Sequence, residues 1–211
     1  QQLKFQSSFG DEFTAYDISF AEPHLYGRDL YVKGDLYSEL QDSESVNYET
    51  EKIGLGFSFG FPLSYNNRIL TKYSIFNDKT TADSDATSYE KMLAGTSTVS
   101  SFGYSFSSDK RNSPYKPSAG YKYVLQQDIA GIGGDSFFIK STYDHTYYKR
   151  LSKSFIGSLK LNFGHLNGYN NKYAPISSYF NLGGNRLRGF QSQRVGPKTG
   201  NSYTGGQYFY L

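Results

Sequence analysis

The side chains best suited to chemistry are three histidines, because the chain contains no cysteine. His24, His145 and His165 lie far apart in the sequence, and none has the His-x-x-x-His or glutamate-containing spacing that holds zinc. Without cysteine there is also no thiolate to serve as a nucleophile or metal ligand. We therefore expect no metal, no other cofactor and no thiol catalysis.

Two local patterns could still indicate an enzyme. Asp144 and His145 could belong to a hydrolase triad, but adjacent residues on a strand face opposite sides, so we expect His145 to be a strand residue near an aromatic belt. The glycine-rich segment 131–135 is expected to be a hairpin loop rather than a phosphate cradle, because strand patterns flank it and no helix follows. We predict that the protein is not an enzyme.

Most of the chain alternates between apolar and polar residues, as a β-strand with two different faces does. In 52–61 the large apolar residues stand at every second position: Ile53, Leu55, Phe57, Phe59 and Phe61. The same alternation returns at 121–129, 137–147 and 155–163, and weaker copies begin near Leu3, Thr14, Leu30, Ile69, Thr98 and Gly205. The pattern predicts an all-β fold of about ten strands, each roughly 8 to 14 residues long, and no window has a convincing helical period.

The composition is compatible with strands that cross a membrane. Mean hydropathy is only −0.60, but a transmembrane β-barrel is apolar on alternate residues alone, so its mean hydropathy stays low. We expect a transmembrane antiparallel β-barrel with a lipid-facing belt that includes Phe57, Phe59, Phe61, Phe102, Tyr104 and Phe106. A soluble β-sandwich explains the alternation equally well strand by strand. The dispersed net charge of +3 argues against binding to nucleic acid.

The predicted links between strands alternate in length, as the short turns and long outer loops of outer-membrane barrels do. Short turns are expected at 22–28, 62–67 and 149–153, and longer polar links at 40–50 and 77–90. The same alternation makes the segment around 180–203 a long outer loop.

Two motifs add to this pattern. The first is Gly183-Gly184, a short spacer with Asn185 and Arg186, then Arg188-Gly189-Phe190, with Gln191-Ser192 and Gly196-Pro197 after it; the second is Asp109, Arg111, Pro117 and Gly120, expected to form a periplasmic turn. In type, order and separation they resemble the sixth outer loop of the Omp85 superfamily and the turn upstream of it. The resemblance covers nearly all of 1–211, with the outer loop at about 175–204. It is closest to the subunit that assembles outer-membrane barrels.

The resemblance implies roles for the first motif. Arg188 would clamp the loop inside the barrel, Phe190 would pack beside it, and Gly189 would permit their close approach. An arginine is suited to this because it carries a fixed charge and five donors, and glycines such as Gly184 allow tight turns beside it. The acidic partners of Arg188 would lie on strands later in the family's barrel. A solvated basic loop residue is the alternative interpretation.

The resemblance also implies that the chain covers part of a barrel of about sixteen strands. We expect the periplasmic repeats, the first strands and the last strands to lie outside it, and we expect a mature or excised segment, because no secretion signal opens the chain. The implied function is an assembly factor in the bacterial outer membrane. It would act on unfolded outer-membrane proteins within the lipid bilayer, with accessory lipoproteins. The alternatives are a polypeptide transporter of the two-partner-secretion type or related pore, and an outer-membrane hydrolase.

Overall fold

The computed structural model describes residues 1–42, 46–184, 187–191, 193–199, 202–203 and 205–211. They form one ten-stranded antiparallel sheet, in which each strand pairs with the next along the chain up to β9, which then pairs with β12. The strands of this sheet are β1 Gln2–Gly10, β2 Phe13–Glu22, β3 Tyr31–Asp42, β4 Tyr48–Ser64, β5 Asn67–Ala82, β6 Gly95–Asp109, β7 Gly120–Ala130, β8 Phe138–Arg150, β9 Ile156–Gly168 and β12 Tyr208–Tyr210. The number and places of the strands confirm the prediction from alternation.

Five short elements lie in the links of the described chain. A small hairpin is formed by β10 Lys198–Thr199 and β11 Ser202–Tyr203, and the helical turns are η1 Leu25–Gly27, α1 Ser88–Leu93 and η2 Ile176–Ser178. The short helix α1 has no signal in the sequence pattern. Thr87 caps that helix and Glu90 completes a capping box, but six residues are too few to show a helical period. No helix among the described residues is long and apolar enough to cross a membrane.

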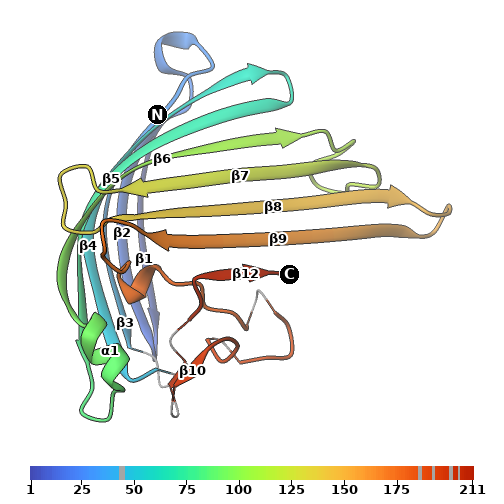
Figure 1. The fold of residues 1–211 in the computed structure, drawn as a ribbon. Coiled ribbons are helices and arrows are strands. Elements are labelled where there is room, and N and C mark those ends of the chain that lie inside the picture. The colour runs from blue at the N-terminus through green and yellow to red at the C-terminus, as the bar shows by residue number, and fades with distance from the viewer. Residues whose placement is uncertain (43–45, 185–186, 192, 200–201, 204) are drawn as a thin grey trace.

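The sheet is strongly curved, with a concave face that the last part of the chain enters (Figure 1). We call one edge of strand ends the turn rim; it carries the links 23–30, 65–66, 110–119 and 151–155. The opposite edge, the loop rim, carries the links 11–12, 43–47, 83–94, 131–137 and 169–207.

The predicted alternation in link length is only partly correct. Most of the expected link 40–50 is strand, because β3 continues to Asp42 and β4 begins at Tyr48. Similarly, β5 continues to Ala82 inside the expected link 77–90. These strand ends extend past the band of apolar residues on the convex face and are therefore polar. A change from apolar to polar residues thus did not indicate where the strands end. The link 131–137 does join two antiparallel strands, as predicted for a hairpin loop.

The two faces of the sheet differ as the alternation predicts. On the convex face Phe57 pairs with Tyr73, and Tyr73 pairs with Phe102 on its other side. Phe57 is 51% exposed and Phe102 is 42% exposed, whereas Ser58, which follows Phe57 on β4 and faces the concave side, is buried. A sandwich would bury the apolar face against a second sheet, so these exposures favour the barrel wall over the sandwich.

Candidate functional site

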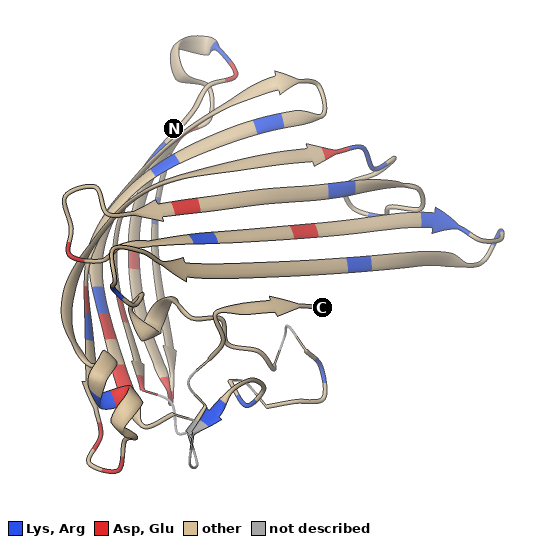
Figure 2. Cartoon of the chain, in the orientation of Figure 1, with Lys and Arg blue, Asp and Glu red and all other residues tan. Residues whose placement is uncertain are grey.

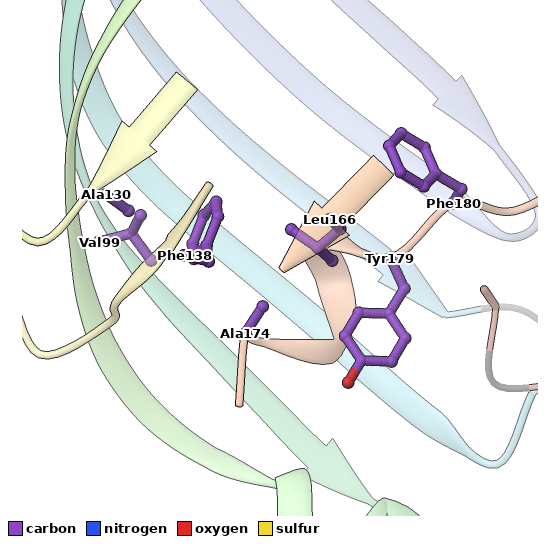
Figure 3. Packing of buried hydrophobic residues seen from close by; sticks show 7 residues of the cluster. All are labelled: Val99, Ala130, Phe138, Leu166, Ala174, Tyr179 and Phe180. Carbon is purple, nitrogen blue, oxygen red and sulfur yellow. The ribbon is translucent and has the colours of Figure 1, made fainter. Parts of the chain in front are cut away.

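The most developed site is the place where the link 169–207 turns inward and packs on the concave face. Val99, Ala130, Phe138 and Leu166 form an apolar row across β6–β9, close to the loop rim. Ala174, Tyr179 and Phe180 from the link cover this row (Figure 3). All seven side chains are at most 6% exposed. The site is therefore held first by the burial of apolar surface.

Three polar side chains of the strand wall then fix the link at η2, two through its backbone carbonyls and one through a serine hydroxyl. Lys52 of β4 donates a hydrogen bond of 3.3 Å from Nζ to the carbonyl of Ser177, and Lys140 of β8 donates one of 2.7 Å to the carbonyl of Ser178. The hydroxyl of Ser177 donates to a carboxylate oxygen of Asp78 on β5. The wall thus satisfies link groups that would otherwise be buried without partners. We call Lys52, Asp78, Lys140, Ser177 and Ser178 the η2 anchor.

Tyr179 and Phe180 extend the contact beyond η2. The hydroxyls of Tyr179 and Tyr89 are 3.0 Å apart, and burial, followed by this hydrogen bond, holds the pKa of Tyr179 well above its usual range. The Phe180 ring packs edge-on against Phe209 of β12 at 4.9 Å, and Lys140 Nζ lies 4.8 Å from its centre. Backbone hydrogen bonds of 2.8 and 2.9 Å pair Phe180 with Gly206. These contacts bring the start and the end of the long link together.

The first two glycines of the first motif lie in a tight backbone turn. Gly183 and Gly184 have φ values of 113° and 57°, and Gly184 donates a hydrogen bond of 2.8 Å to the carbonyl of Phe190. A Cβ on Gly183 would overlap the carbonyl oxygen of Gln191. A side chain at position 183 would therefore clash in a backbone conformation that glycine adopts readily.

The remaining residues of this motif lie at the surface of the described chain. Arg188 and Gly189 are exposed, Phe190 is 55% exposed, and Gly196 and Pro197 are exposed. Within the described residues Arg188 forms no salt bridge, and its clamp role stays a prediction. Asn185, Arg186 and Ser192 of the motif lie outside the described residues.

The second motif forms a compact turn at the opposite rim. Arg111 binds Asp109 through two hydrogen bonds, of 2.8 Å from Nε and 2.6 Å from Nη2, and this pairing raises the pKa of Arg111. Gly120 has a φ of 99°, and a Cβ there would overlap the carbonyl of Lys110. Pro117 is half-buried. The structure therefore keeps the two motifs apart, one on each rim, and each forms its own local structure.

Sequence reasoning missed the η2 anchor. Its signal was present in the alternation, because Lys52, Asp78 and Lys140 are charged residues at positions that face into the sheet's concave side. A charge at such a position needs a partner, and the apolar residues Ala174 and Ile176 inside an otherwise polar link indicate where that partner comes from.

The residues considered for catalysis do not converge in the structure. The ring of His145 accepts or donates a hydrogen bond of 2.9 Å with the hydroxyl of Tyr143 and stacks on Tyr123, in an aromatic group on the convex face. A Gly-x-Ser-x-Gly sequence does occur at 56–60, but it lies within β4 and not at the strand-to-helix turn of a hydrolase. Among the described residues no group of three or more His, Cys, Asp or Glu side chains could hold a metal ion.

The concave face beside the anchor is hollowed and polar. A hollow of about 650 Å³ is lined by strand residues that include Asp128, Lys140, Asp144 and Lys160, and by Phe180 of the link. Charges of both signs on this face, with apolar side chains on the other, are typical of the inside of a membrane barrel.

A curved meander with an apolar convex face, a polar concave face and an inward-turned loop defines the wall of a transmembrane β-barrel. The model of the Omp85 superfamily domain matches residues 1–210, and the chain belongs to the Omp85 superfamily.

Individual relatives agree with this assignment. The mouse protein "Sorting and assembly machinery component 50 homolog" is 28% identical over 213 residues, which are 100% of this chain and 45% of that protein. "Outer membrane protein assembly factor BamA" of Neorickettsia risticii is 27% identical over 201 residues, which are 93% of this chain and 27% of that protein. The chain thus spans less than half the length of these relatives, and it is about equally similar to both.

The fold has a solved counterpart. The crystal structure of BamA from Haemophilus ducreyi lacking POTRA domains 1–3 superposes with a TM-score of 0.88, at 19% identity, over 99% of this chain and 45% of that one. The described strands therefore have the fold of part of that barrel. The family relationship places the protein in an outer membrane.

Proposed function

We propose that this chain is part of the barrel of an assembly factor that folds and inserts β-barrel proteins into the outer membrane. The observation that carries the proposal is its similarity, along nearly its whole length, to the sorting and assembly machinery component 50 homologues and to BamA. The names of both relatives refer to assembly, and their similarity to this chain includes both the strand wall and the long link.

The proposed work is templating and needs no bond chemistry or cofactor. A barrel protein that enters a bilayer must pair the backbone groups of each strand before they meet lipid, because unpaired groups there are costly. A barrel that presents a strand edge and perturbs the nearby bilayer lowers this cost. The long link, which the η2 anchor holds on the concave face, would stabilise the curvature of the wall while a strand edge pairs with the substrate. The seam between the family's first and last strands is expected outside these residues.

The proposed partners follow from the same relationship. They are the lipid bilayer, unfolded outer-membrane proteins as substrates, and accessory lipoproteins of an assembly complex. We assign the protein to the bacterial outer membrane. This is supported by the Arg188-Gly189-Phe190 motif with its Gly196-Pro197 continuation, which resembles the bacterial subunit, and by the similarity to BamA of Neorickettsia risticii.

A second candidate function is passive or secretory transport of polypeptide by the same kind of barrel. The polar hollow beside the η2 anchor favours this candidate, because a concave face that carries Asp128, Asp144 and Lys160 would hold water.

Reconstitution of the full-length protein in liposomes tests both functions. The folding of an urea-unfolded barrel substrate is timed with the native protein, with Arg188→Ala and, as a control, with Lys91→Ala in α1. Faster folding that Arg188→Ala loses and Lys91→Ala keeps would support assembly and the clamp together. No acceleration by the native protein, accompanied by ion or polypeptide conductance, would overturn the assembly proposal in favour of transport.

A further inference from the structure

Two neighbouring links on the turn rim are basic and contain no acidic residue. Segments 110–119 and 149–155 carry six cations between them and neither aspartate nor glutamate: Lys110, Arg111, Lys116, Lys149, Arg150 and Lys153. A hydrogen bond of 3.1 Å from Arg150 Nη2 to Ser118 Oγ joins the two links. We call these two segments the basic rim patch. Asp109 compensates Arg111, so five cations remain for another partner.

The basic rim patch also exposes large apolar side chains. Tyr115 is 92% exposed, Leu151 is 68% exposed and Phe155 is 70% exposed. Cations interspersed with exposed aromatic and aliphatic side chains are the composition of surfaces that lie in a membrane interface. An apolar side chain there reaches toward the acyl chains, while the cations remain at headgroup level.

The place of the patch along the strands fits the headgroup region. On the convex face Tyr121 pairs with Tyr147, and Tyr123 pairs with His145, which forms an aromatic belt near the turn rim. Lys149 follows Tyr147 on the same face, about 7 Å further along the strand. Lys110 Nζ lies 5.7 Å from the centre of the Tyr121 ring. The cations therefore begin where the aromatic belt ends, which is the order found at the edge of a bilayer.

The loop rim is mixed in charge, because link 169–207 carries five cations and no acidic residue, whereas two other links there are acidic. Link 83–94 carries Asp83, Asp85 and Glu90 against Lys91, and link 11–12 is Asp11-Glu12. In Figure 2, blue segments gather where β6–β9 meet the turn rim, and red segments lie on and around α1 at the loop rim. Acidic links therefore occur on the loop rim, whereas the two segments of the basic rim patch contain no acidic residue.

We propose that the basic rim patch binds the headgroups of anionic phospholipids in the leaflet that meets the turn rim. Phosphate oxygens would accept hydrogen bonds from Lys110, Lys149 and Lys153, while Leu151 and Phe155 enter the interface beside them. The exposed apolar residues favour a lipid surface over an acidic protein, because they would insert between acyl chains that a protein surface does not offer.

The test measures which lipids stay with the protein. Full-length protein is reconstituted in vesicles of equal phosphatidylglycerol and phosphatidylcholine, extracted with a mild detergent, and its retained lipids are counted by mass spectrometry. The variant Lys110→Gln/Lys149→Gln/Lys153→Gln is compared with Lys79→Gln/Lys91→Gln/Lys172→Gln, which removes three exposed lysines near the loop rim. No folding substrate is present, so the result is independent of the assembly proposal.

We expect the native protein and the loop-rim variant to enrich phosphatidylglycerol at least about twofold over its share in the vesicle. The turn-rim variant should lose this enrichment, and molar salt should abolish it in the native protein and the loop-rim variant, since exposed charges are screened. Equal retention of both lipids by the native protein would overturn the proposal, and so would equal losses in the two triple variants. Capture of an acidic accessory subunit through these lysines, without lipid enrichment, would also overturn it.

Discussion

Lys140 donates a hydrogen bond of 2.7 Å to the backbone carbonyl of Ser178, and this bond joins strand β8 to the long link. The same ammonium group lies 4.8 Å from the centre of the Phe180 ring. The Lys140 side chain therefore holds two neighbouring parts of the link. It contacts Ser178 through a hydrogen bond and Phe180 through a cation–π interaction. Its position on the concave face keeps these contacts away from lipid.

Replacing Lys140 by methionine should loosen the link and leave the strands intact. Methionine keeps much of the apolar stem but loses the charged donor, and a hydrogen bond from a charged group is worth about 2 kcal/mol, or roughly thirtyfold in local opening. Hydrogen exchange of the peptide around Phe180 and Gly206, whose amides pair with each other, measures this opening. Lys160→Met, a change on the neighbouring strand, serves as the control. Equal protection in the two variants would contradict the role of Lys140.

Removing the hydroxyl of Ser177 should cost more than the loss of a surface contact. Asp78 is 1% exposed, and within the described residues its Oδ1 has no hydrogen-bond partner, so Ser177 supplies the bond to its other oxygen. Ser177→Ala should lower the free energy of link opening by about 2 kcal/mol, because it leaves a buried acceptor without its donor. In an Asp78→Ala background the same change should cost almost nothing. Additive costs in this double-mutant cycle would show that the pair does not interact.

A methyl group at Gly164 should displace the aromatic pair that closes the link. A Cβ at this position would overlap the Phe209 ring and would lie 2.9 Å from Cζ of Phe180. We expect Gly164→Ala to destabilise the link by about 1 to 3 kcal/mol, the usual cost of overpacking. Gly34→Ala is the matched strand variant, because nothing lies within 4 Å of its Cβ. Gly164→Ala should lower the thermal unfolding temperature and the hydrogen-exchange protection at Phe180, whereas Gly34→Ala should change neither. Unchanged stability and protection in Gly164→Ala would refute this packing.

The strands could be predicted because alternation is a local property. Phe57, Phe59 and Phe61 alternate with Ser58 and Gly60 whatever lies next to them, and a sheet with one apolar face follows directly. The motifs around Arg188 and Asp109 indicated the Omp85 superfamily, and the match to the superfamily domain confirms this prediction.

The alternation marks the charged wall residues of the η2 anchor, but their individual partners could not be predicted, because these contacts join distant parts of the chain. Asp78 and Ser177 are separated by 99 positions, and the local sequence around each residue does not identify the other as its partner. The extent of strands β3 and β5 was missed for a related reason. Residues 77–82 are mostly polar, and they are strand only because β4 and β6 provide hydrogen-bonding partners for them.

The link between β5 and α1 should be more stable in acid than at neutral pH. Partial desolvation, followed by the charges of Asp85, Asp42 and Glu90, raises the pKa of Asp83, which is itself exposed. A raised carboxyl pKa means that the folded state binds the proton more tightly, so the stabilisation is complete below the unfolded pKa and is lost as pH rises through the folded pKa. Hydrogen exchange of segment 83–94, corrected for its intrinsic pH dependence, should therefore show more protection near about pH 4 than near about pH 7. Asp83→Asn should flatten this difference, whereas Asp11→Asn, in another link of the loop rim, should leave it unchanged. An undiminished pH dependence in Asp83→Asn would assign the effect to the neighbouring carboxylates instead.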